Sequence, residues 1–103
     1  MARVSEVEVA LATMQYLNTL PDREATIDAI IDALPNYLTL GDADRSDSET
    51  RPGEQLWEQQ VRNIVSHKLT SGNAINTGYL EHRPPARLFL TDAGVVHLKR
   101  EGL

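Results

Sequence analysis

Side chains that can form paired hydrogen bonds recur at helical spacing between residues 55 and 70. At about 100° per residue they gather within roughly a third of a helix circumference, and none of them is acidic. Amide side chains can pair with adenine, a guanidinium with guanine and a serine hydroxyl with either, so this face suits the base edges of duplex DNA. The alternative is an ordinary solvent-exposed helix face. The candidate base-reading residues are Gln55, Gln59, Arg62, Asn63 and Ser66, and Thr70 lies on the same face.

Cationic side chains that could contact phosphates accompany this segment. Two arginines flank Pro84 and Pro85, where a cation could contact the DNA backbone or the minor groove while the prolines stiffen the tip. The alternative is a solubilising turn that carries two arginines. Between residues 59 and 90 the only acid is Glu81, so this stretch has a local positive excess. The candidate phosphate contacts are His67, Lys68, Arg83 and Arg87; for His67, as for His82, a plain hydrogen-bonding role is the alternative.

The residue patterns that catalysis and metal binding require are missing from the sequence. It has no His-Glu-x-x-His helix, no nuclease-type pairing of Asp with Lys and no nucleophile elbow around a serine. Because it has no cysteine, it has no thiolate nucleophile and no cysteine-based zinc site. The acidic run 42–49 resembles a calcium loop in composition only, since the required glycine and final glutamate spacing are absent. We therefore expect a protein that is not an enzyme and uses no metal or cofactor.

Four helices, a loop and a hairpin are predicted to position these residues. Apolar steps of three and four predict helices over 4–20, about 27–34 and 54–67, with an acidic, flexible loop at about 41–53. Residues 79–90 predict a β-hairpin, and Thr91 caps a final helix. This order is that of a winged helix-turn-helix, mainly α with a small hairpin, in which the third helix enters the major groove and the hairpin contacts the backbone. The first helix is expected to bury Val7, Leu11, Met14 and either Leu17 or Tyr16.

Length and charge limit these expectations. The 103 residues suffice for one domain, and they leave no room for a second, catalytic domain. The net charge of -5 opposes DNA binding, but it is unevenly distributed. Residues 1–50 carry three Lys or Arg against ten acids, a charge of -7, whereas 51–103 carry seven against five, a charge of +2. With no apolar run of about 18 residues and no cysteine, we expect a cytoplasmic protein without membrane contact.

The C-terminal half also resembles a known family. Residues 57–80, WEQQVRNIVSHKLTSGNAINTGYL, followed by the hairpin and by LTDAG at 90–94, resemble the N-terminal winged-helix domain of Mrr-type restriction enzymes. The resemblance is best over 54–103 and weaker over the first two helices. It implies that the domain recognises double-stranded DNA while a separate nuclease domain cuts it. A standalone copy would then be a restriction-associated or transcription-regulatory module.

The sequence leaves two questions about partners open: whether the domain binds a protein instead of DNA, and whether it forms a homodimer. The charge of -7 in the first half favours an alternative function, a winged-helix protein-protein interaction module without DNA binding. A palindromic DNA site would require a homodimer. We expect its interface on the first helix, because Val4, Val9 and Leu20 lie partly off the predicted core stripe.

Overall fold

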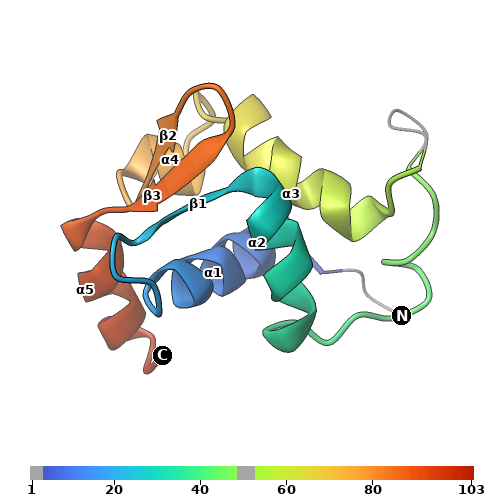
Figure 1. Ribbon diagram of the computed structural model, residues 1–103, viewed down its shortest axis with the longest axis horizontal. Helices are drawn as coiled ribbons and strands as arrows, with labels where there is room; N and C mark the ends of the chain where they lie inside the picture. The colour runs from blue at the N-terminus through green and yellow to red at the C-terminus, as the bar shows by residue number, and fades with distance from the viewer. Residues whose placement is uncertain (1–3, 49–52) are drawn as a thin grey trace.

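One antiparallel sheet connects the N-terminal and C-terminal halves of the chain. The computed structural model describes residues 4–48 and 53–103. In the described residues the strands have the order β1-β3-β2, so β3 is central, and Figure 1 shows β1 alongside β3. The elements are α1 (Glu6–Leu17), β1 (Glu24–Thr26), α2 (Ile27–Ala33), the 3-10 helix η1 (Leu34–Asn36), α3 (Leu56–Ser66), α4 (Ala74–Thr77), β2 (Leu80–Arg83), β3 (Arg87–Leu90) and α5 (Asp92–Arg100).

Local side-chain caps explain where the helices begin. Ser5 Oγ accepts the Glu8 N–H at 3.1 Å and the Glu8 carboxylate accepts the Ser5 N–H at 3.1 Å, a reciprocal capping box at the start of α1. Thr26 caps α2 and Thr91 caps α5 in the same manner, each accepting one backbone N–H. The cap expected at Thr91 is thus confirmed.

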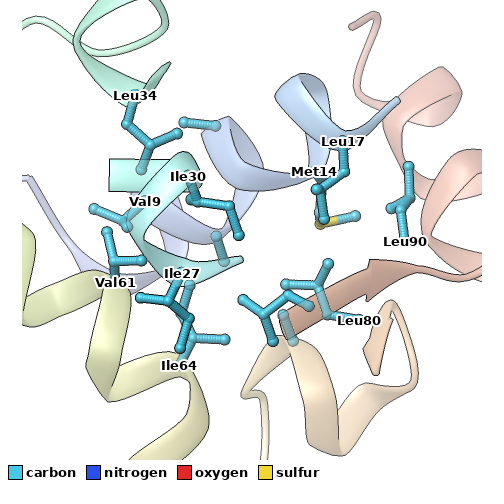
Figure 2. Packing of buried hydrophobic residues seen from close by; sticks show 14 of the residues in the cluster. Val9, Met14, Leu17, Ile27, Ile30, Leu34, Val61, Ile64, Leu80 and Leu90 are labelled. Carbon is cyan, nitrogen blue, oxygen red and sulfur yellow. The ribbon is translucent and has the colours of Figure 1, made fainter. Parts of the chain in front are cut away.

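The core lies where α1, α2, α3 and the sheet converge. Helix α1 contacts α2, α3, α5 and β3 and lies at the centre of the molecule in Figure 1. Figure 2 shows side chains from these elements pointing into one interior. Those that it labels are Val9, Met14 and Leu17 of α1, Ile27 and Ile30 of α2, Leu34 of η1, Val61 and Ile64 of α3, Leu80 of β2 and Leu90 of β3.

The buried face of α1 differs from the expected one. Val7 is 64% exposed, whereas Val9 is fully buried and Val4 is only 8% exposed. Met14 and Leu17 are buried as expected and Leu11 is half-buried, so the expected stripe is wrong at Val7, where the helix buries Val9 instead. The expected dimer contact through Val4 and Val9 is therefore wrong, since both side chains lie in the core.

The acidic segment between η1 and α3 contains more fixed contacts than its composition suggests. The buried Asp44 carboxylate accepts the Val4 N–H at 2.8 Å and the Gly41 N–H at 2.9 Å, which links this segment to the start of α1. Ser48 N–H donates to the Glu54 carbonyl at 2.8 Å. Within the loop predicted at about 41–53, Asp44 and Ser48 are therefore buried. Residues 49–52 of the predicted loop lie outside the described residues.

Most of the expected elements are confirmed, with three additions. The second and third helices, the hairpin and the final helix occur within a few residues of their predicted bounds. Strand β1, the 3-10 helix η1 and the one-turn helix α4 were not expected. Asn73 caps α4, and Gly78 ends it at a φ of 92°. No helix in the described ranges is long and apolar enough to cross a membrane.

Candidate nucleic-acid interface

The two glutamines predicted to read bases already have internal partners. Gln55 precedes α3, and its side-chain oxygen accepts the Trp57 indole N–H at 2.8 Å. Gln59 Oε1 accepts the Ser48 hydroxyl at 2.6 Å, so the segment before α3 lies against this part of the helix. Both glutamines are half-buried. Their carbonyl oxygens are consequently engaged by the protein itself.

Arg62, the predicted guanine contact, is held by two carboxylates. Its Nε donates to Glu54 at 2.8 and 3.1 Å, and its Nη2 lies 3.5 Å from Asp28 Oδ1 on α2. The Arg62 side chain is 25% exposed. The third helix itself contributes no acid to this face, but residues outside the helix do. The expected acid-free surface is therefore wrong around Arg62.

The other two base-reading candidates lie apart from Arg62. Asn63 Nδ2 donates to Gln60 at 3.4 Å, and Asn63 lines a groove of about 180 Å³ together with Val4 and Asp44. Ser66, at the end of α3, is exposed, and its hydroxyl donates to the Arg62 carbonyl at 3.4 Å. The five predicted side chains thus share a helix without forming one open surface.

The turn that follows α3 is the exposed part of the predicted site. Residues 66–72 are all exposed, and the chain turns at Gly72 with a φ of 88°. His67 ends α3, and its Nδ1 lies 2.7 Å from Glu6 Oε1 on α1. Among the predicted site residues, all of which the structure describes, Lys68 is the one cation without a carboxylate partner. Lys68 lines an open groove of about 450 Å³ with His82 and Pro84 of the hairpin region.

The hairpin arginines form a compact charge cluster with residues of the sheet. Arg83 Nη1 lies 2.6 Å from Glu24 Oε1 on β1, its Nε lies 2.7 Å from Glu81 Oε2, and its guanidinium lies 4.0 Å from the centre of the Phe89 ring. Hydrogen bonds to Glu81 and then to Glu24 raise the pKa of the Arg83 guanidinium above its usual value. Arg87 Nη1 lies 3.5 Å from Glu24 Oε2, and half of its side chain is exposed.

The structure does not bring the predicted residues together on one surface. Lys68 lines one groove with Glu81, His82 and Pro84, so the turn after α3 lies next to the β2–β3 tip, but Arg83 and Arg87 do not line this groove. Gln59 contacts Ser48 in the segment before α3, and Arg62 contacts Asp28 of α2. Gln55 contacts Trp57 of α3 itself. Sequence reasoning missed the carboxylates of Glu6, Glu24, Asp28 and Glu54, which reach the cations from other elements. No local spacing could have indicated the contacts of Glu6, Glu24 or Asp28.

Across 4–48 and 53–103, no three His, Asp or Glu side chains lie close enough together to hold a metal ion. The chain matches no known family model, no curated protein and no solved structure.

Proposed function

We propose that this protein is a winged-helix domain that binds duplex DNA through the turn after α3 and the β2–β3 hairpin. The observation that carries the proposal is the open groove between Lys68 and the hairpin, which lies at the end of the third helix of the chain. In a winged helix the third helix approaches the major groove and the hairpin, or wing, approaches the flanking backbone. The sheet order β1-β3-β2, with β1 inserted between the first two helices, is compatible with this plan.

The geometry favours phosphate contacts over base reading. Lys68, Arg83 and Arg87 have exposed side chains, although the Glu24 carboxylate that pairs with both arginines is only 22% exposed. A phosphate can compete with the carboxylate of a partly exposed ion pair because such pairs contribute little to stability. Ser66, which is exposed, remains a candidate for a base edge. Gln55, Gln59 and Arg62 could read bases only after giving up their internal partners. We therefore expect weak sequence preference.

A binding titration with a labelled random duplex of about 20 base pairs tests the proposal, because a random duplex measures phosphate binding without knowledge of the target. Affinity should fall steeply between about 50 and 200 mM salt. Lys68→Ala should weaken binding about fivefold to tenfold and reduce the salt slope by about one, because it removes an unpaired cation. Arg87→Ala should weaken binding with a smaller change in slope, since Arg87 already has a carboxylate partner.

Lys99→Ala is the matched control, because Lys99 is also exposed but lies in the last turn of α5. Its affinity should equal that of the wild type. Equal losses in Lys68→Ala and Lys99→Ala would show that only overall charge matters and would contradict the proposed site. No binding by the wild type at low salt would contradict DNA binding itself.

A second candidate function is protein-protein interaction through the same surface. The observation that favours it is the neutralisation of Arg62, Arg83 and Arg87 by carboxylates, which produces a surface of mixed charge. Such a surface suits a protein partner better than a uniformly anionic backbone. The titration discriminates the two functions, because an interaction module should not bind the duplex even at low salt. A restriction-associated or regulatory role, as in the Mrr-type family, would apply to the DNA-binding form.

A further inference from the structure

One carboxylate of α1 bridges the two ends of the exposed turn between α3 and α4. Glu6 Oε1 lies 2.7 Å from His67 Nδ1, at the end of α3. Glu6 Oε2 accepts the Asn73 Nδ2–H at 3.4 Å, at the start of α4. The Glu6 side chain is 27% exposed. A residue more than sixty positions earlier in the sequence therefore connects both ends of this turn to α1.

The side chain of Asn73 makes this bridge part of a buried hydrogen-bond network. It is 5% exposed, and both its donor hydrogens and both its acceptor positions are in use. Besides Glu6, its Nδ2 donates to the Ile64 carbonyl at 3.0 Å. Its Oδ1 accepts the Ile75 and Asn76 N–H groups at 2.8 and 3.2 Å. This amide thus links the end of α3, the start of α4 and, through Glu6, the first turn of α1.

The turn between these two anchors is exposed. None of residues 66–72 has its side chain buried in the core. Within the turn, the Thr70 N–H donates to the His67 carbonyl and the Asn73 N–H to the Thr70 carbonyl. Exposed segments with few buried contacts open at a low cost in free energy. The position of the turn therefore depends on its two ends, which are the residues that Glu6 contacts.

We propose that Glu6 is a positioning residue of the DNA-binding surface, which holds the turn so that Lys68 lies beside the hairpin. The inference rests on the proposed function, because Lys68 at the groove is the expected phosphate contact. A side chain that is already in place costs less conformational entropy when DNA binds. Glu6 is also an acid and repels phosphates. Positioning and repulsion therefore predict effects of opposite sign when Glu6 is replaced.

Glu6→Ala removes the bridge, and Glu6→Gln is its charge-matched comparison. At about pH 8, where an imidazole is ordinarily uncharged, the glutamine amide can donate to His67 Nδ1 and accept from Asn73. In titration with the random duplex, Glu6→Ala should bind about threefold to fivefold more weakly than Glu6→Gln, because Lys68 must then be ordered on binding. In the Lys68→Ala background the two variants should bind equally, since no cation is left to position. A purely structural role of Glu6 would not depend on Lys68.

NMR relaxation of the protein without DNA measures the restraint on the turn directly. The N–H order parameters of residues 69–72 should be near about 0.85 in the wild type and Glu6→Gln, and below about 0.6 in Glu6→Ala. Glu6 is the first residue of α1, where alanine is a good helix former, so Glu6→Ala should fold. Urea unfolding checks that it does.

Several results would overturn the role of Glu6. One is that Glu6→Ala binds duplex as tightly as Glu6→Gln, and another is that their difference persists in the Lys68→Ala background. Order parameters that do not change in Glu6→Ala would overturn it as well. A wild type that binds no duplex would instead contradict the proposed function, and the order parameters alone would then decide whether Glu6 restrains the turn.

Discussion

Removing the charge of Glu24 should strengthen DNA binding, if the hairpin is the site. Glu24 Oε1 lies 2.6 Å from Arg83 and its Oε2 lies 3.5 Å from Arg87, so one carboxylate restrains both hairpin arginines. The variant Glu24→Gln keeps the size of the side chain and an acceptor oxygen but removes the charge. Arg87 then becomes available to a phosphate, whereas Arg83 keeps its pair with Glu81, and the charge of residue 24 no longer repels the DNA.

The size of the effect follows from the ion-pair distance and Coulomb's law. A phosphate bound to the far side of Arg83 would lie about 6 Å from the Glu24 carboxylate, given ordinary hydrogen-bond lengths. At about 6 Å in water two unit charges repel by about 0.7 kcal/mol, so two phosphates give about 1.4 kcal/mol, or tenfold in affinity. At about 0.15 M salt, where the Debye length is about 8 Å, screening reduces the gain to about threefold.

Fluorescence anisotropy with the random duplex at low and physiological salt measures this gain. Asp32→Asn is the matched control, because Asp32 is an exposed acid on α2 and the exchange also raises the net charge by one unit. We expect Glu24→Gln to bind more tightly than Asp32→Asn at both salt concentrations. Equal affinities would refute the argument, since the gain would then come from net charge and not from the hairpin arginines.

Two further predictions concern the stability of the fold, and urea unfolding measures both. Gly94→Ala should lower the free energy of unfolding by about 1 to 3 kcal/mol, because a Cβ at this position would overlap the Tyr79 carbonyl oxygen. The control, Ala93→Ser at an exposed neighbouring position, should change the free energy of unfolding by less than about 0.5 kcal/mol. Asp44→Asn should cost about 1.5 to 3 kcal/mol, because the amide retains one acceptor oxygen for the buried Val4 N–H and the half-buried Gly41 N–H. Asp42→Asn, at an exposed position, should cost little. If Gly94→Ala loses no more stability than Ala93→Ser, the close packing of Gly94 on Tyr79 is contradicted. If Asp44→Asn loses no more than Asp42→Asn, the stabilising role of the Asp44 hydrogen bonds is contradicted.

Apolar spacing predicts the longer elements of this fold, because a helix face or a hairpin is encoded within a few consecutive turns. The apolar stripe of Trp57, Val61, Ile64 and Val65 on α3 is an example: the first three side chains are buried and Val65 is half-buried. Strand β1 is different, since its three residues become a strand only by pairing with β3, more than sixty residues later. Helix α4 is a single turn, too short for any period to indicate.

For the candidate site too, the sequence indicates features within one helix but not contacts between distant elements. A helical wheel shows which side chains of α3 point away from the core, but it contains no information about other elements that cover them. Asp28 of α2 reaches Arg62, and Glu24 reaches Arg83 across 59 residues of sequence. Such pairs depend on the tertiary arrangement. The face of α3 has no acid of its own, as the sequence indicates, but acids from other parts of the chain lie against it.

The ion pairs also determine what the salt dependence of DNA binding can report. When a phosphate replaces the carboxylate partner of an arginine, the DNA releases a counterion, but the freed carboxylate attracts a cation from solution and offsets part of that release. Lys68 leaves no carboxylate behind, so its contact should contribute a full counterion. The salt slope of the wild type should therefore reflect Lys68 more than Arg83 and Arg87. In Glu24→Gln the slope should become steeper by about one, because Arg87 then reaches a phosphate without freeing a carboxylate, whereas Arg83 still has Glu81.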